Sequence, residues 1–236
     1  MTKINDVFFD LDRTLWDFER NSETALHVLY EEYKLGDYVD KLESFVEVYK
    51  EVNARYWKEY GDGKITKEDL RQGRFRDTLK TFNIKSEKMG VEMNDKYIEI
   101  SPLQTHLFPS TKEVLTELKN QEYKLHIITN GFLEVQTLKL KNSGLTSFFE
   151  SVLCSEEVGK NKPHPAVFQE AMRRAEAKAH QSMMIGDDIR TDIIGAENVG
   201  IKALLFDPYK LYENNVGIDS ITSLSEIPNR ILGIGN

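Results

Sequence analysis

Cysteine is almost absent from this chain of 236 residues. Cys154 is the only one, so no disulfide can form within the chain. This favours a reducing compartment, and we expect a cytoplasmic protein. Long apolar runs are also lacking: none approaches the roughly 20 residues of a membrane-spanning helix, and the first, Val7 to Phe9, is too short for the hydrophobic region of a signal peptide. We therefore predict a soluble protein without a membrane partner.

An excess of positive charge is lacking too. The net charge is −8 and the isoelectric point is near 5.3. Sequence-independent binding of nucleic acid needs a basic face, so we expect no nucleic-acid polymer as partner. A small phosphorylated metabolite remains compatible, because a few local cationic side chains and a metal ion can hold one. The length allows one sizeable domain, or a core with a smaller inserted domain, and we expect a monomer or homodimer.

Short apolar runs bounded by turn residues are what the sequence has instead. Five recur, at Val7–Phe9, Leu125–Ile128, Ser151–Cys154, Met183–Ile185 and Ala203–Phe206. Such runs suit strands buried on both faces of a parallel sheet. Between the later runs, apolar residues recur at helical spacing: Val114, Leu115 and Leu118; Val135, Leu138 and Leu140; Val167, Phe168, Ala171 and Met172. The alternation predicts an α/β fold with a Rossmann-like, doubly wound parallel sheet.

The segment from residue 18 to residue 103 breaks this alternation. It has no strand-like run, but it has apolar residues at helical spacing, at Ala25, Leu26, Leu29 and Tyr33, then at Leu42, Phe45, Val46, Tyr49, Val52 and Tyr56. Thr66 with Asp69 resembles a capping box that opens a further helix. An elaborate crossover is the alternative, but crossovers rarely need so long a segment. We predict an all-helical domain, residues 18–103, inserted into an α/β core made of residues 1–17 and 104–236.

Polar residues follow three of the predicted strands. Asp10 and Asp12 follow the first, Thr129 and Asn130 the second, and Asp187 and Asp188 the fourth, with Asp192 close behind. Ligands of open α/β sheets bind at the carboxyl ends of the strands, so these groups should converge. Neighbouring carboxylates repel one another unless a cation lies between them, and hard oxygen ligands suit Mg²⁺. The alternative is a set of solvated turns, where Asp and Asn-Gly are common.

Lys162 lies in a loop with two prolines, Pro163 and Pro165. These make a helical start at the lysine unfavourable, so a fixed loop can hold its side chain. An ammonium group can neutralise both a carboxylate and a phosphoryl oxygen, and the Thr129 hydroxyl and backbone amides near Asn130 are common phosphate ligands. A solvated lysine is the alternative interpretation.

These segments, in this order, resemble the four motifs of the haloacid dehalogenase superfamily. The matching segments are Asp10-Leu11-Asp12-Arg13-Thr14-Leu15, Ile-Ile-Thr129-Asn-Gly, Lys162-Pro-His-Pro-Ala-Val-Phe, and Gly-Asp187-Asp-Ile-Arg-Thr-Asp192. The resemblance covers essentially the whole chain, with the helical insert in the place of a C1-type cap. It implies an enzyme, a Mg²⁺-dependent phosphomonoesterase.

The resemblance also implies a role for each residue. Asp10 attacks phosphorus and forms an aspartyl-phosphate, and Asp12 protonates the leaving group and later activates water. Thr129, Asn130 and Lys162 stabilise the phosphoryl oxygens. Mg²⁺ is held by Asp10, the backbone carbonyl of Asp12 and Asp187, with Asp188 and Asp192 behind them. Asp12 indicates a phosphate ester as substrate, because dehalogenases lack an acid at that position. Arg13 differs from the resemblance, since many relatives have a small residue there.

The substrate should be selected by the inserted domain. Candidates are Trp16 and Phe18 near its start and Arg71 and Arg74 in the helix after Thr66, although hinge packing and solvated faces are the alternatives. The first two motifs resemble those of house-cleaning pyrimidine 5′-nucleotidases, which suggests a nucleoside 5′-monophosphate. Sugar phosphatases and phosphomutases share the core residues. A phosphonate hydrolase, which needs a reactive cap lysine, and a non-catalytic phosphate-binding protein are the remaining alternatives.

Overall fold

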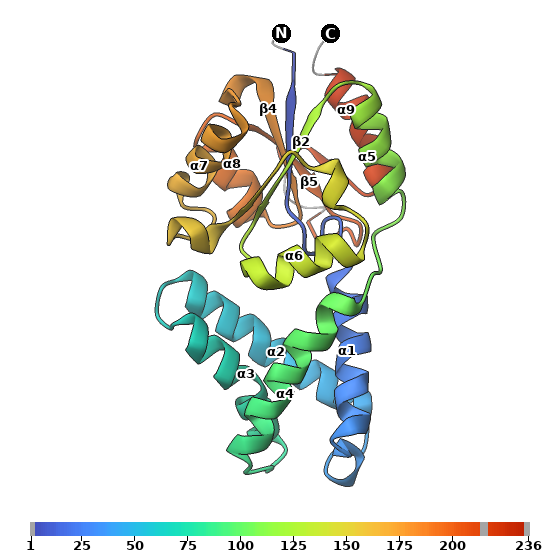
Figure 1. Ribbon diagram of the computed structural model, residues 1–236, viewed down its shortest axis with the longest axis vertical. Coiled ribbons are helices and arrows are strands. Elements are labelled where there is room, and N and C mark those ends of the chain that lie inside the picture. Colours follow the sequence, from blue (N-terminus) through green and yellow to red (C-terminus); the bar gives the residue numbers. More distant parts are fainter. Residues whose placement is uncertain (1–2, 213–216, 234–236) are drawn as a thin grey trace. The chain divides into compact units, whose positions relative to one another are not determined.

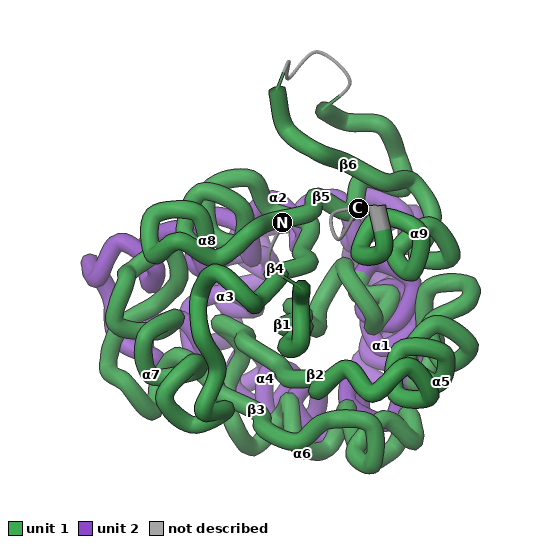
Figure 2. Tube along the Cα trace, turned by 90° about the horizontal axis from the view of Figure 1, so that it is seen from above, with its two compact units in different colours: residues 1–18, 105–236 green, residues 19–104 purple. Residues whose placement is uncertain are grey.

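The computed structural model describes residues 3–212 and 217–233. The chain divides into two compact units, which Figure 2 shows in two colours. We call residues 1–18 and 105–236 the core unit, and residues 19–104 the helical unit. The helical unit differs from the predicted insert by one residue at each end. Its role as a cap stays a prediction.

The core unit is built on one parallel sheet of six strands in the order β3-β2-β1-β4-β5-β6. The strands are β1 (Asp6–Phe9), β2 (Lys124–Thr129), β3 (Ser151–Cys154), β4 (Ser182–Gly186), β5 (Lys202–Phe206) and β6 (Ser220–Ile221). The first five coincide with the predicted apolar runs. β6 was not predicted, because a strand of two residues leaves no apolar run to detect.

Helices cover both faces of the sheet, which confirms the doubly wound fold. The core unit contains α5 (Thr111–Asn120), α6 (Leu133–Asn142), α7 (Pro165–Ala175), α8 (Gly195–Glu197) and α9 (Ile227–Gly233). Figure 1 labels β2, β4 and β5 of this sheet, with α7 and α8 to one side and α5 and α9 to the other. Successive residues of β1 point to opposite faces. Val7 and Phe9 join the apolar cluster that contains residues of α5 and α9, whereas Phe8 joins the cluster with residues of α7 and α8.

The helical unit is formed by α1 (Phe18–Glu32), α2 (Leu42–Gly61), α3 (Lys67–Thr81) and α4 (Glu87–Ile100). Its core is formed by apolar side chains that recur at helical spacing. Among them are Leu26, Leu29, Phe45 and Phe75, which are all fully buried. The unit thus has an apolar core of its own, as the spacing predicts.

The two chain segments that connect the units are paired with each other inside the core unit. Trp16 and Leu107 form an antiparallel bridge. Beside it, Asp17 N donates to His106 O over 3.1 Å and Phe108 N to Leu15 O over 3.0 Å. We call these paired segments the neck of the insertion.

A polar cluster joins β1, β2 and β3 near their amino ends. His126 Nε2 lies 3.3 Å from Asp6 Oδ1, and Nδ1 lies 2.8 Å from Ser151 Oγ. The residue types are those of a serine hydrolase. However, the imidazole is 1% exposed and stacks on Phe8, with 4.8 Å between ring centroids, so no substrate reaches it. The cluster links the three strands and is not a catalytic site.

The capping box predicted at Thr66 is present and begins α3. Asp69 N donates to Thr66 Oγ1 over 3.1 Å, and Thr66 N donates to Asp69 Oδ2 over 2.9 Å. Thr66→Ala should therefore lower the free energy of unfolding by about 1 kcal/mol, because it removes an acceptor for an amide of the first turn. Urea denaturation followed by circular dichroism measures the loss. Thr66→Ser should restore stability; an equal loss in both variants would contradict this origin.

Candidate active site

Asp10 lies just past the end of β1, where the chain begins a tight turn. Its backbone N donates to Ile185 O of β4 over 2.9 Å, and Leu15 N and Trp16 N both donate to Leu11 O. These bonds fix the turn at the carboxyl ends of two neighbouring strands. The Asp10 residue is 7% exposed.

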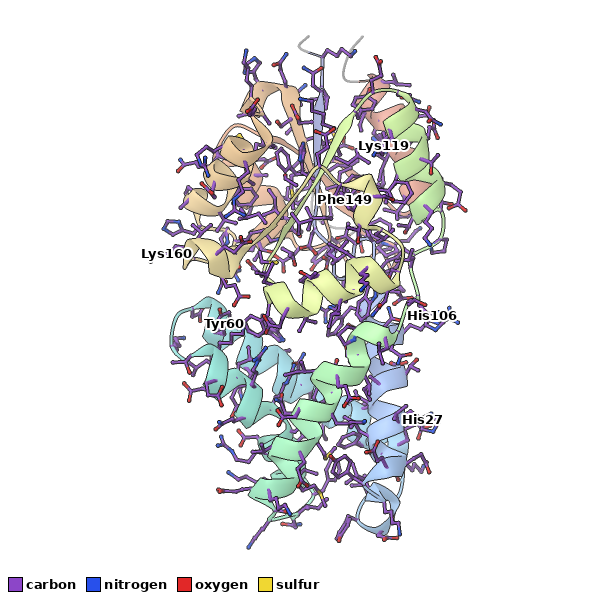
Figure 3. The ribbon with its side chains drawn as sticks, in the orientation of Figure 1. His27, Tyr60, His106, Lys119, Phe149 and Lys160 are labelled. Atoms are coloured by element: carbon purple, nitrogen blue, oxygen red, sulfur yellow. The ribbon has the colours of Figure 1, made fainter. Side chains whose placement is uncertain are left out.

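Lys162 places a buried ammonium group against Asp10. Its Nζ donates to Asp10 Oδ1 over 2.7 Å, to Asp192 Oδ1 over 2.6 Å and to Ile128 O over 2.8 Å, which uses all three protons. Lys162 is 3% exposed, whereas Lys160 of the same loop is exposed (Figure 3). The loop therefore holds the lysine inside the core unit, as its prolines suggested.

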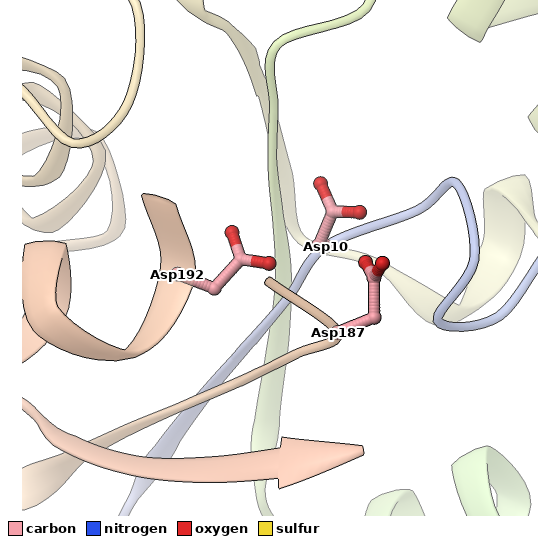
Figure 4. A group of neighbouring side chains, drawn as sticks. All are labelled: Asp10, Asp187 and Asp192. Atoms are coloured by element: carbon pink, nitrogen blue, oxygen red, sulfur yellow. The ribbon is translucent and has the colours of Figure 1, made fainter. Parts of the chain in front are cut away.

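Asp187 and Asp192 complete a group of three carboxylates with Asp10, shown in Figure 4. One oxygen from each lies within 4.8 Å of the others. The Thr14 hydroxyl donates to Asp187 Oδ1 over 3.3 Å, and Asp188 N donates to Asp192 Oδ2 over 3.2 Å. Three hard oxygen donors at this spacing fit a small divalent cation such as Mg²⁺.

Burial and mutual repulsion raise the pKa values of this group. Burial raises the pKa of Asp10 to about 7, although Lys162 opposes the shift, and Asp192 adds to it. Burial, followed by the charges of Asp10 and Asp192, raises the pKa of Asp187 well above its usual range. Burial would lower the pKa of the Lys162 ammonium, but the Asp10 and Asp192 carboxylates raise it instead. When ionised, the three carboxylates thus carry more negative charge than one lysine offsets, and a bound cation would reduce the repulsion between them.

Asp12 has partners different from those of Asp10. Lys139 Nζ lies 2.5 Å from Asp12 Oδ1, and Gln136 Nε2 donates to Asp12 Oδ2 over 2.9 Å. The same Gln136 nitrogen lies 2.8 Å from Thr129 Oγ1. The two carboxylates of the first motif are therefore held by separate cations, and Asp12 is linked to the end of β2.

The side chains of Asn130 and Asp188 form hydrogen bonds with backbone groups. Asn130 Oδ1 accepts from Lys162 N over 2.8 Å, and Asn130 Nδ2 donates to Lys162 O over 3.2 Å. The Asn130 side chain thus holds the lysine loop, a contact that its turn propensity did not indicate. Asp188 Oδ1 accepts from Thr191 N over 2.6 Å and caps the helical turn that carries Asp192.

The candidate substrate residues differ in their surroundings. Trp16 is fully buried in the core unit, and Arg74 is 7% exposed inside the helical unit, where its guanidinium donates to Asn94 and Asn53. Their burial favours packing roles over contact with a leaving group. Phe18 is half-buried beneath the exposed Arg13, whose guanidinium carbon lies 4.3 Å from the ring centroid, and Arg71 is half-buried.

Sequence reasoning missed Thr14, Gln136 and Lys139. The spacing of Val135, Leu138 and Leu140 in α6 predicts an apolar buried face, but only Leu140 of the three is buried. Gln136 and Lys139 are buried instead, because they bond to Asp12. The sequence did contain an indication: the apolar residues of this helix do not share one face, whereas a helix that packs on a sheet normally buries one apolar face.

Comparison with known proteins agrees with this geometry. The family described as haloacid dehalogenase-like hydrolases matches residues 7–206 of the chain. The chain belongs to this family. The resemblance stated from the four motifs is thereby confirmed, as is the prediction of an enzyme of the hydrolase class.

Individual relatives of this hydrolase support the assignment. The pyrimidine 5′-nucleotidase PynA of Streptococcus pneumoniae is 31% identical over 207 residues, which cover 87% of this chain and 84% of PynA. A ribulose-1,5-bisphosphate 5-phosphatase of Halopiger xanaduensis is 32% identical over 204 residues, which cover 86% of this chain and 84% of that protein. The crystal structure of the HAD-hydrolase YfnB of Bacillus subtilis, bound to magnesium, has a TM-score of 0.88 at 25% identity and covers 98% of this chain and 100% of YfnB.

The hydrolase has no helix suited to a lipid bilayer in the part that the structure describes. Among residues 3–212 and 217–233, none of the helices is both long enough and apolar enough to span a membrane.

Proposed function

We propose that this hydrolase is a Mg²⁺-dependent phosphomonoesterase that acts through an aspartyl-phosphate on Asp10. The observation that carries the proposal is the group formed by Asp10, Lys162, Asp187 and Asp192, with Asp12 two residues from the nucleophile. A protein that only bound phosphate would have no use for Asp12. The alternative of a non-catalytic binding protein is therefore disfavoured.

The reaction has two steps. In the first, an Asp10 carboxylate oxygen forms a bond to phosphorus while the bond from phosphorus to the ester oxygen breaks, and Asp12 gives its proton to that leaving oxygen. In the second, water attacks the phosphorus of the aspartyl-phosphate and Asp12 takes a proton from the water. Inorganic phosphate leaves, and the Asp10 carboxylate is restored.

The positively charged and polar groups around Asp10 serve the phosphoryl group. We assign the Thr129 hydroxyl and the backbone at Asn130 to hydrogen bonds with its oxygens. Lys162, whose three protons already have acceptors, stabilises the same oxygens through its positive charge as charge spreads over them during transfer. Asp10, Asp187 and the backbone carbonyl of Asp12 would hold Mg²⁺, with Asp192 positioned by Lys162 and Asp188 N. When bound, Mg²⁺ would neutralise the carboxylates and offset the charge of the phosphoryl oxygens.

The substrate we propose is a small phosphorylated metabolite, with nucleoside 5′-monophosphates first. The relative PynA is named as a pyrimidine 5′-nucleotidase. A sugar phosphate is the second candidate, because another relative of similar identity is named as a ribulose-1,5-bisphosphate phosphatase. Both substrate classes have alkoxide leaving groups, which need a proton from Asp12.

Phosphate release from a substrate panel tests the proposal. We expect Mg²⁺-dependent release from at least one nucleoside monophosphate or sugar phosphate, and its loss in EDTA. Mg²⁺ at 100 times its dissociation constant should also stabilise the fold by about 2.7 kcal/mol, an effect that thermal melting detects without any substrate. Asp187→Asn should abolish this stabilisation. If no ester in the panel released phosphate in the presence of Mg²⁺, the proposed activity would be wrong.

A further inference from the structure

Lys139 of α6 carries a buried ammonium group to which the reaction proposed above gives no role. The residue is 4% exposed, and its Nζ lies 2.5 Å from Asp12 Oδ1 and 4.1 Å from the centroid of the Trp16 ring. The ammonium group of a lysine normally stays in contact with water, even where the rest of the side chain is buried. Removing the charge from water costs several kcal/mol unless the ion is paired, so the Asp12 carboxylate and the indole face are what stabilise it here.

Gln136 holds the other oxygen of Asp12. Its Nε2 donates to Asp12 Oδ2 over 2.9 Å and lies 2.8 Å from Thr129 Oγ1, and Gln136 is fully buried. Its Oε1 is buried without a hydrogen-bond partner among the residues that the structure describes, a cost of about 1–3 kcal/mol. The opposite amide orientation would bring Oε1 against the Asp12 carboxylate, so the contact with Asp12 dictates the orientation seen.

The backbone at Gly131 leaves room for this arrangement. A Cβ at position 131 would lie 2.3 Å from Gln136 Nε2. Gly131 N also donates to Thr129 Oγ1 over 3.1 Å. The turn after β2 therefore fits around the amide that joins Thr129 to Asp12.

We infer that Lys139, together with Gln136, is a positioning residue that fixes the Asp12 carboxyl group in one orientation, in which it gives its proton to the leaving oxygen and later takes a proton from water. Both donors can serve both forms, because a protonated carboxyl group keeps acceptor lone pairs beside its O–H. The inference rests on the proposed function. Each oxygen of Asp12 has one donor from α6, so rotation of the carboxylate breaks at least one buried contact. An acid held in this way transfers its proton from one geometry, which is a condition for efficient general acid catalysis.

The leaving group provides a readout that a purely structural role would not change. An alkoxide leaving group needs the proton from Asp12, whereas p-nitrophenolate leaves without one. A misplaced Asp12 therefore slows phosphoryl transfer from alkyl esters selectively. It also slows hydrolysis of the aspartyl-phosphate, because the same carboxylate activates water in the second step.

The experiment compares Lys139→Met with wild type on the best alkyl phosphate of the panel and on p-nitrophenyl phosphate. For Lys139→Met we expect kcat/KM to fall by about 10²-fold with the alkyl ester and by less than about 3-fold with the aryl ester. A burst of p-nitrophenolate equal to the enzyme concentration should appear, since the intermediate accumulates. Lys139→Arg should recover most of the alkyl activity. Lys141→Met, at an exposed lysine of the same helix, is the matched control and should behave as wild type.

Gln136→Met provides a second variant should Lys139→Met fail to fold. It also removes the donor to Thr129 Oγ1, so kcat/KM should fall with both esters, and more with the alkyl ester. Asp12→Asn sets the reference pattern. An equal loss of kcat/KM with both esters, or no loss, in the folded variants would overturn the inference while leaving the phosphatase proposal intact. Absence of phosphate release by wild type would instead overturn the proposed function.

Discussion

Asp10→Asn is expected to lower phosphate release by about 10⁴-fold or more while the chain stays folded. The amide cannot form the aspartyl-phosphate, and the contacts of Lys162 with Asp192 and Ile128 remain. The assay is steady-state phosphate release with Mg²⁺ and the best substrate of the panel. Activity within about 100-fold of wild type would contradict the covalent mechanism.

The same variant should not be less stable than wild type in the absence of metal. Burial raises the pKa of Asp10 from 3.8 to about 7, so between these values the folded chain keeps a proton that the unfolded chain releases. The stability of the wild type therefore falls as the pH rises from about 4 to about 7, whereas the variant has a neutral amide in place of this carboxyl and escapes that loss. In EDTA, the melting temperature of the variant should equal or exceed that of wild type at pH 8, and the difference should shrink towards pH 4.

Melting curves across this pH range test the linkage. Asp40→Asn, at an exposed carboxylate of the helical unit, is the control for the change from Asp to Asn and should melt as wild type does at pH 8. Should Asp10→Asn melt well below wild type at pH 8 in EDTA, the charged Asp10 would be stabilising, and the repulsion inferred within the carboxylate group would be wrong.

Lys162→Met is expected to cost about 3–5 kcal/mol of folding free energy and to abolish activity. The substitution leaves the Asp10 and Asp192 carboxylates buried without their shared cation, and it leaves Ile128 O without this donor. Breaking one member of a buried ion group is costly because the remaining charge has no compensation. Urea denaturation at pH 8 in EDTA measures the change.

Two further variants test the cause of the stability loss in Lys162→Met. Lys160→Met removes a charge from the exposed part of the same loop and should change stability by less than about 0.5 kcal/mol. Adding Asp10→Asn to Lys162→Met should recover part of the lost stability, because one of the two unpaired carboxylates is removed. If Asp10→Asn changed stability equally in the wild type and in the Lys162→Met background, the loop itself, and not the charges, would be what Lys162 supports.

The residues that follow the carboxyl ends of the strands could be predicted to lie together, because a parallel sheet places these strand ends at one edge. β1 lies between β2 and β4, so whatever follows these strands meets at one edge. Asp10 and Asp187 follow directly from this rule. Lys162 could be anticipated from its loop, although its three acceptors depend on how α7 and its preceding turn dock on the sheet, which spacing does not report.

The partners of Asp12 could not be predicted from apolar periodicity. That method assumes that the buried face of a helix is the apolar one. In α6, Leu133 and Leu138 are each 43% exposed while Lys139 is 4% exposed. Burial here follows charge pairing rather than transfer of apolar surface from water. Trp16 reflects the same limit: an aromatic side chain near a candidate site suggests ligand contact, but this indole packs in the core and faces an ammonium.

The neck formed around Trp16 and Leu107 bears on how the sheet assembles. β1 pairs with β2 across the whole insertion, so this pairing closes a long loop in the folding chain. Loop-closure entropy grows only with the logarithm of length, by about 0.6 kcal/mol for each doubling. Because the chain leaves the core unit and returns to it at the paired segments of the neck, the length of the insertion has little effect on the free energy of forming the sheet. The helices between can be lengthened, shortened or exchanged in evolution while Asp10 and its neighbours keep their places.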